Sequence, residues 1–271
     1  SFGYLWISTS YGLDRYDGYS FENFFYGSPA GKSLCSNFVN HVQEDEEHNL
    51  WVSTDAGVSC FNYSTQSAEH IRFSDDGIYF VHKTLNRAGL LYAATDRGIV
   101  VYDKKSRTSF LLELDSLTHR SVHDIAIDRE GKLWFTQNEN ACSYDLTSKR
   151  LTCYPTEKSV HYINDELWLK VLTGSDGTLW LATANGLLEY DRSSDRFHKI
   201  VDTEGNIGIA VQDSLIWIAN WESGLIRYNR HTGKKEYLSP SGAGKESPDF
   251  SPLVCVFVDK DQVVWTGGGK G

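Results

Sequence analysis

The strongest constraint on this chain is one pattern that recurs along its whole length. Each copy begins with Leu, Ile or Val before an aromatic residue, continues through hydrophobic and small residues, and typically ends at Tyr-Asp or a close relative. The copies are LWISTSYGLDRYD (5–17), LWVSTDAGVSCFN (50–62), LYAATDRGIVVYD (91–103), LWFTQNENACSYD (133–145), LWLATANGLLEYD (179–191) and IWIANWESGLIRYN (216–229), and a seventh, VWTGGGKG, starts at Val264. Such self-similarity indicates an array of like units.

The spacing of the aromatic anchors predicts the architecture. The anchors are Trp6, Trp51, Tyr92, Trp134, Trp180, Trp217 and Trp265. They follow one another at about 43 residues on average, which is the length of a four-stranded propeller blade. The sequence therefore predicts an all-β protein, a β-propeller of four-stranded antiparallel blades that forms a single domain over residues 1–271.

Each unit can be divided into four strands from its residue types. β-branched and aromatic runs precede the anchor and predict a first strand, as in 77–85, 121–128, 207–213 and 252–259. The anchor segment is the second strand, and a glycine that can take a positive φ in a hairpin ends it. Amphipathic segments such as 196–200 and 235–238 supply an outer fourth strand.

The position of the copies leaves two blade numbers open. The chain starts at a second strand, contains five complete blades and ends inside the second strand of a seventh, which favours an incomplete seven-bladed propeller. In the alternative, residues 252–259 supply the first strand of the opening blade and close a ring of six.

The second strands are hydrophobic on both faces, which a sheet needs when neighbours cover both. A small residue stands two positions after the first six anchors (Ser8, Ser53, Ala94, Thr136, Ala182 and Ala219) and would let adjacent blades approach closely. We therefore interpret the tryptophans as packing between blades rather than as ligand contacts.

Charge and composition exclude several functions. With 36 acidic and 26 basic side chains the formal charge is -10, so nucleic acid is not an expected partner. The chain as given has neither an apolar run of 18 residues nor a signal peptide at its start. Among the five cysteines, Cys142 and Cys153 flank a predicted hairpin and could pair; free thiols packed as small hydrophobic groups are the favoured alternative.

The repeat resembles the two-component regulator propeller repeat, most closely in DREGKLWFTQ (128–137) and GTLWLATANGLLEYD (177–191). The resemblance covers essentially the whole chain, although the fourth copy has QNENAC where a glycine turn is expected. It implies a paired seven-bladed propeller in the periplasmic sensor region of a hybrid histidine kinase of polysaccharide-degrading gut bacteria. The implied partners are an oligosaccharide or related ligand, a further propeller, and the membrane and kinase regions of the same polypeptide, in an arrangement that allows a homodimer.

Chemistry of the chain's own is not predicted. Asp45, Glu46 and Glu47 are adjacent acids, but they lie on a turn and are interpreted as solvated. The sequence SDGTLW (175–180) lacks the spacing of a sialidase box, and HRSVH (119–123) does not lie on a helix that would direct both histidines to one metal. We therefore expect no enzymatic activity in this region, no metal and no cofactor, with a carbohydrate-active propeller enzyme and a protein-interaction scaffold as alternatives.

Ligands of propellers usually gather over the loops between second and third strands and the loops that join blades. Carbohydrate recognition needs aromatic faces beside amide, carboxylate and guanidinium groups. The candidates are Trp221, Glu222, Asn220, Arg97, Asn138, Glu139, Asn185, Tyr11 and His161. The sixth copy is one residue longer than its siblings, and Trp221 and Glu222 are the residues that the repeat does not require.

Overall fold

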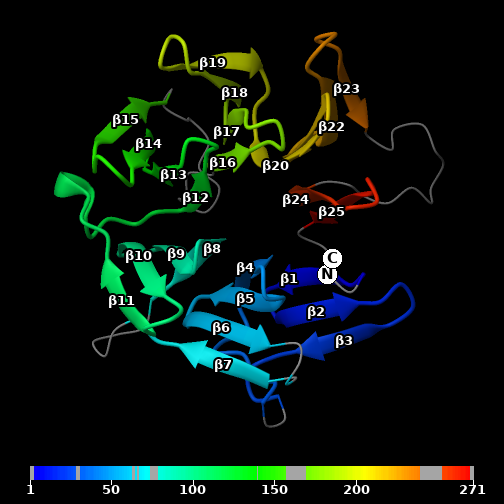
Figure 1. The fold of residues 1–271 in the computed structure, drawn as a ribbon. Coiled ribbons are helices and arrows are strands. Elements are labelled where there is room, and N and C mark those ends of the chain that lie inside the picture. Colours follow the sequence, from blue (N-terminus) through cyan, green and yellow to red (C-terminus); the bar gives the residue numbers. More distant parts are fainter. Residues whose placement is uncertain are drawn as a thin grey trace. The chain divides into compact units, whose positions relative to one another are not determined.

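The structure is a computed structural model that describes residues 3–28, 31–62, 65, 67–73, 79–138, 140–156, 169–238 and 252–268 (Figure 1). In these residues the chain forms strands and one short 3-10 helix, so the all-β prediction is confirmed. The chain divides into two compact units, residues 1–125 and 126–271. The single domain over residues 1–271 stays a prediction.

The first unit contains three antiparallel sheets. The opening sheet has the order β1-β2-β3, and the next two are complete blades with the orders β4-β5-β6-β7 and β11-β10-β9-β8. Their strands are β1 (Leu5–Thr9), β2 (Gly12–Tyr16), β3 (Phe21–Phe24), β4 (Val39–Glu44), β5 (Asn49–Thr54), β6 (Gly57–Asn62), β7 (Ser67–Ile71), β8 (Val81–Arg87), β9 (Leu90–Thr95), β10 (Gly98–Asp103) and β11 (Thr108–Leu111), followed by the 3-10 helix η1 (Asp115–Leu117).

Three further complete blades and a two-stranded sheet follow, mostly in the second unit. The orders are β12-β13-β14-β15, β16-β17-β18-β19, β20-β21-β22-β23 and β24-β25. Their strands are β12 (Asp124–Ile127), β13 (Lys132–Gln137), β14 (Asn140–Asp145), β15 (Leu151–Pro155), β16 (Lys170–Thr173), β17 (Leu179–Thr183), β18 (Gly186–Asp191), β19 (Arg196–Val201), β20 (Asn206–Gln212), β21 (Leu215–Asn220), β22 (Gly224–Asn229), β23 (Lys235–Leu238), β24 (Leu253–Val258) and β25 (Val264–Gly268).

These strands confirm the predicted division of each repeat. Five sheets are complete four-stranded antiparallel blades, the opening sheet lacks a first strand, and the last sheet has two strands. The predictions of seven and of six blades differ in the role that they give to strand β24. In a seven-bladed propeller β24 is the first strand of the last blade, and it pairs with β25. In a six-bladed propeller it would be the first strand of the opening blade.

The predicted packing of the second strands is confirmed in the five complete blades, whereas β1 is half-buried and β25 is partly exposed. In β5, β9, β13 and β21 every residue after the first is buried, and β17 is buried throughout. Four of the small residues two positions after the anchor are fully buried, namely Ser53, Ala94, Thr136 and Ala219. The Ser53 hydroxyl lies 3.2 Å from the Thr84 hydroxyl of the next blade, which shows how closely the backbones approach.

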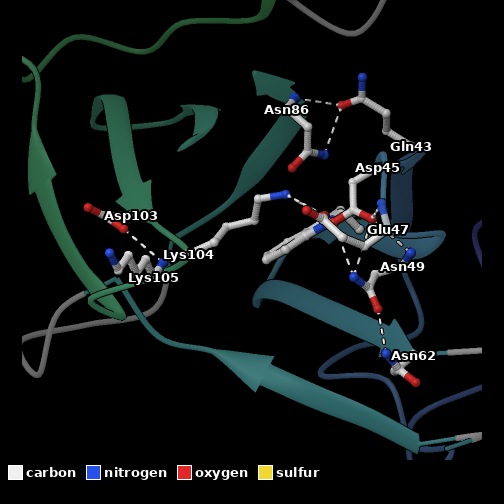
Figure 2. A network of polar contacts seen from close by, with 10 residues as sticks. Gln43, Asp45, Glu47, Asn49, Asn62, Asn86, Asp103, Lys104 and Lys105 are labelled. Atoms are coloured by element: carbon white, nitrogen blue, oxygen red, sulfur yellow. Dashed lines mark hydrogen bonds and ion pairs between the residues drawn. The ribbon is translucent and has the colours of Figure 1, made fainter. Parts of the chain in front are cut away.

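A buried carboxylate holds the anchor of the second blade (Figure 2). Asp45, which directly follows the first strand, accepts hydrogen bonds from the backbone N–H of Glu47 at 3.1 Å and of Asn49 at 2.8 Å. Its second oxygen accepts the indole N–H of Trp51 at 2.7 Å. We call this arrangement the carboxylate clamp. The interpretation of Asp45 as a solvated turn residue is wrong, because a paired carboxylate can be buried.

The same clamp recurs wherever an aspartate precedes the tryptophan by six positions. Asp128 accepts the indole N–H of Trp134 at 2.9 Å, and Asp259 accepts that of Trp265 at 2.8 Å. Both also accept two backbone N–H groups of their turn. In the sixth blade the amide oxygen of Gln212 replaces the carboxylate, 2.8 Å from Trp217 Nε1.

A cation from the following blade completes two clamps. In the first unit, Lys104 Nζ lies 3.1 Å from Asp45 Oδ2 and 5.6 Å from the Trp51 ring centre. In the second unit, Arg192 Nη2 lies 3.6 Å from Asp128 Oδ2. Both bases directly follow the Asp that ends the third strand of their own blade. Each clamp therefore joins two successive blades.

Hydrogen bonds determine the charge of the clamp. Burial alone would raise the pKa of Asp45, but the bonds from Trp51, Asn49 and Lys104 outweigh it and hold the pKa below its ordinary value. Because the folded-state pKa is the lower one, the ionised clamp stabilises the fold above a pH of about 4. That contribution is lost as the pH falls through the folded-state pKa.

The fifth blade departs from this arrangement. Gly174 stands six positions before Trp180, whose buried Nε1 has no hydrogen-bond partner among the described residues. Asp176 lies two positions later, accepts the backbone N–H of Thr178 at 3.0 Å and pairs with Arg230 at 2.6 Å. The cation of the next blade is therefore kept, although the indole is not bound.

A disulfide joins two strands of the fourth blade. Cys142 and Cys153 are directly opposite in the β14–β15 register, with Cα atoms 4.1 Å apart, and their sulfurs are bonded. The favoured prediction of free thiols is thus wrong for this pair, because the hairpin places both side chains within bonding distance. Cys35, Cys60 and Cys255 are free thiols.

We expect Asp45→Ala to lower the free energy of unfolding by about 3 kcal/mol, because Lys104 and the Trp51 indole lose a buried charged partner. Urea unfolding at pH 7 measures the loss. Glu46→Ala, an exposed neighbour on the same turn, is the matched control and should change stability by less than about 0.5 kcal/mol. Equal effects of the two substitutions would contradict the clamp.

The double substitution Gly174→Asp with Asp176→Glu gives the fifth turn the acid spacing of the fourth. We expect it to raise the free energy of unfolding by about 1 kcal/mol, since the Trp180 indole gains an acceptor. Gly174→Asp alone should not stabilise, because its Cβ would lie 3.0 Å from the Asp176 carboxylate. A double variant no more stable than the single one would refute the argument.

Thiol counting tests the disulfide. In denaturant without reductant, three of the five cysteines should react with a thiol reagent, and all five after reduction. Replacing both Cys142 and Cys153 by Ser should reduce stability by up to about 3 kcal/mol, because closing a loop of this length restricts the unfolded chain. Five reactive thiols before reduction would show that the pair is open.

Candidate functional site

The hairpin between the second and third strands has one construction in most blades. A threonine ends the second strand, and its hydroxyl donates to the carbonyl of the glycine that starts the third, as Thr54 does to Gly57 at 3.0 Å. The same hydroxyl accepts the backbone N–H of the second loop residue, Ala56, at 3.1 Å. The threonine hydroxyl thus holds the turn from beneath.

Four of the predicted ligand residues occupy the second loop position of this construction. The backbone N–H groups of Tyr11, Arg97 and Asn185 bond to the threonine hydroxyls of their hairpins at 3.0, 3.1 and 3.2 Å. Glu222 has the same place in the sixth blade, where its N–H bonds to Asn220 Oδ1 at 3.0 Å. The repeat therefore places these four side chains at equivalent positions.

The first loop position is tied to the residue that precedes the first strand of the same blade. The Asp55 N–H donates to the Phe38 carbonyl at 3.3 Å, and the Asp96 N–H donates to the Phe80 carbonyl at 3.1 Å. In the sixth blade the Trp221 N–H donates to the Gly205 carbonyl at 2.8 Å. Each of these pairs contains one aromatic residue, at the strand start in two blades and on the hairpin in the third.

In the first unit, both predicted residues lie at the surface. The Tyr11 side chain is 85% exposed. Arg97 is also exposed, with its guanidinium carbon 4.9 Å from the centre of the Tyr79 ring. This stack keeps a cationic and aromatic pair beside the third hairpin.

In the second unit, the longer loop of the sixth blade is confirmed. Asn220 and Gly224 are opposite in the β21–β22 register, so three residues form the turn instead of two. Trp221 is 37% exposed and Glu222 is exposed. The extra residue thus adds a large aromatic side chain to the surface of this loop.

The structure gives two predicted residues a supporting role in their hairpins. Asn220 is only 1% exposed, and its side chain bonds to Ser223 N at 2.7 Å and to Asn206 Oδ1 at 3.1 Å, so it shapes the loop from within and is a correction to the predicted ligand set. Asn138 is exposed at the first loop position of its hairpin with a φ of 50°, a conformation that asparagine tolerates. Glu139 and His161 lie outside the described residues, as do most of 154–165 and all of 239–250.

Sequence reasoning missed a row of four rings in the first unit, which we call the ring row (Phe38, Phe80, His82 and His123). Successive ring centres are 6.4, 4.7 and 4.9 Å apart. Its members lie at or just before the first strands of successive blades. The sequence did contain one indication of the ring row. Phe80 and His82 are two residues apart, and alternate residues of a strand share one face.

The second unit has a cavity of about 390 Å³ whose lining includes Asp176, Glu189, Asp191, Arg192 and His198. Hydrogen bonds from Ser194 and Ser193 lower the pKa of Asp191 to about 2. Burial would raise the pKa of Asp176, but bonds from Thr178 and Arg230 hold it below its ordinary value. A general acid for glycoside hydrolysis needs a raised pKa, so neither aspartate is suited to that role.

The described residues show neither a membrane-spanning helix nor a cluster of metal-ligating side chains. They contain no helix with the length and hydropathy of a membrane span. Nor do three or more His, Cys, Asp or Glu side chains converge there as a metal site.

Comparison with known families tests the repeat directly. Residues 33–56 match the two component regulator propeller family, and this segment contains Asp45, Trp51 and Thr54. The predicted resemblance is confirmed. So is the fold class, a β-propeller of four-stranded antiparallel blades.

Relatives were found among both sequences and structures. Histidine kinase P4 of Formosa agariphila is 26% identical over 167 residues, which are 57% of this chain and 12% of the kinase. The extracellular domain of a hybrid two component system of B. thetaiotaomicron is 20% identical, with a TM-score of 0.79 over 98% of this chain and 37% of that one. A streptogramin B lyase is 14% identical, with a TM-score of 0.73 over 97% of this chain and 86% of the lyase. The chain thus spans a small part of the kinase and about a third of the extracellular domain.

Proposed function

We propose that this chain is the ligand-sensing propeller of a hybrid two-component receptor, in which histidine kinase and response regulator domains belong to one polypeptide. The observation that carries the proposal is the family match at residues 33–56, supported by the similarity to a histidine kinase over 167 residues. The further propeller, the membrane segment and the kinase would then be regions of the same polypeptide, and the receptor would act as a homodimer.

We also propose an extracytoplasmic, periplasmic location. The structural similarity to an extracellular receptor domain supports it. The disulfide between Cys142 and Cys153 supports it independently, because such bonds persist in oxidising compartments and are rare in the cytosol.

For the ligand we propose an oligosaccharide released from a polysaccharide. Support comes from the hairpin loops, where aromatic faces stand beside groups that bond hydroxyls, as Trp221 does beside Glu222 and Tyr79 beside Arg97. Sugars present C–H surfaces to aromatic rings and hydroxyls to polar groups, so this mixture suits them.

Binding without turnover is the expected behaviour. The fold alone does not decide this, because a lyase shares it. The low pKa of Asp191 and of Asp176 weighs against either of these two residues as an acid catalyst. Isothermal titration with tetrasaccharides of β-1,3-glucan, β-1,4-xylan, α-1,4-galacturonan and chondroitin, followed by chromatography of the recovered sugar, tests the proposal. A shortened sugar would favour a carbohydrate-active enzyme, and no binding at all would favour a protein-interaction scaffold.

We expect Trp221→Ala to weaken the binding of the best of these sugars about tenfold, because a stacked aromatic face contributes about 1 kcal/mol or more beyond its buried area. The melting temperature should change little, since the side chain is on a surface loop. Tyr237→Ala, which removes a 52% exposed ring from the outer strand β23, is the matched control. Unchanged affinity of the Trp221 variant, or unfolding, would place this tryptophan in the packing.

A further inference from the structure

We propose that Asp55, Phe38 and the adjoining ring row form a saccharide subsite in the first unit. One pyranose ring stacks on Phe38 and donates a hydroxyl hydrogen to the Asp55 carboxylate. This inference rests on the proposed function and adds a location and a recognition chemistry to it. Phe38 and the other members of the ring row were not among the candidates predicted from the sequence.

The stacking surface is the exposed end of the ring row. Phe38 is 45% exposed, although it lies in a structured segment and its carbonyl is bonded to the Asp55 N–H. The ring behind it, Phe80, is 6.4 Å away and partly buried. The row thus supports Phe38 from one side and leaves an aromatic face open to a sugar.

The polar partner is an acceptor that the fold does not use. Asp55 Oδ1 is covered by protein atoms, yet it accepts no hydrogen bond from the described residues. A buried acceptor without a partner costs about 1–3 kcal/mol, so its presence calls for an explanation. Asp55 itself is half-buried, so rotation of its side chain would bring the oxygen to a bound hydroxyl and recover that cost.

The next blade offers an internal comparison. Asp96 has the same loop position as Asp55, but its Oδ1 accepts the backbone N–H of Phe80 at 3.1 Å. In the second blade, the N–H of Phe38 bonds instead to the Ser36 hydroxyl at 3.3 Å. The serine therefore replaces the aspartate in the backbone contact and leaves the Asp55 oxygen available to a ligand.

A carboxylate beside an aromatic ring could also attract an ammonium group. The rest of the ring row favours a hydroxylated ring, because His82 and His123 are imidazoles with ring centres 4.9 Å apart. Imidazoles exchange hydrogen bonds with hydroxyls, whereas in their protonated form they repel a cation.

The test is titration of the whole chain with the four tetrasaccharides named above and with choline as the ammonium probe. Asp55→Ala should weaken binding of the best sugar at least tenfold, as expected for a hydrogen bond to a charged group. Phe38→Ala should weaken it about tenfold, because the stacking face is lost. Asp55→Asn keeps an acceptor oxygen and should lose less. Phe110→Ala, which removes a 57% exposed ring from the outer strand β11, should bind as the unaltered protein does.

The outcomes separate this inference from the proposed function. If a sugar binds and Trp221→Ala weakens it, but Asp55→Ala and Phe38→Ala do not, the subsite is refuted and the sensor stands. Binding of choline in place of every sugar also refutes it. If no sugar binds, the proposed sugar ligand is refuted, and the subsite is refuted with it. Circular dichroism of each variant checks that it is folded. If Phe38→Ala does not fold, the affinity of Asp55→Ala alone tests the subsite.

Discussion

A carboxylate bonded to the indole N–H of the next strand is the interaction on which the blades of this chain depend. The tryptophan is buried where successive blades pack, and a buried N–H without an acceptor, as in Trp180, costs free energy. In the second and fourth blades an aspartate six residues earlier supplies it with one carboxylate oxygen, and the other oxygen holds the turn through backbone N–H groups. Turn geometry and packing between blades are therefore coupled through one side chain, and replacing it disturbs both.

Much of the fold could be predicted because the same motif recurs along the sequence at similar spacing. The strands of the five complete blades follow the predicted division, including the outer strands β19 and β23. The clamp was missed for a physical reason. An aspartate on a turn is usually solvated, and only its partner six residues away shows that Asp45 is buried. The disulfide was missed because sequence spacing does not determine whether Cys142 and Cys153 face each other across a hairpin.

The candidate site was predicted only in part. Tyr11, Arg97, Asn185 and Glu222 do occupy equivalent loop positions, since the repeat fixes where each hairpin turns. Asn220 does not reach the surface, because its side chain replaces the threonine that supports other hairpins. The aromatic residues that precede first strands escaped notice because β-formers are expected there. Comparison of the blades shows that the aromatic residue of this backbone pair precedes the first strand in one blade, as Phe80 does, and lies on the hairpin in another, as Trp221 does.

The cations that reach two of the clamps give the array a direction. Lys104 and Arg192 always reach back to the preceding blade, so an acid in one repeat is matched by a base in the next. Where the third turn carries Asn86 instead of an acid, the following repeat has Leu146 at the position of the base. Neighbouring repeats are therefore not interchangeable modules. Moving one repeat to another place in the chain would separate an acid from its base, so the order of these repeats matters to their stability.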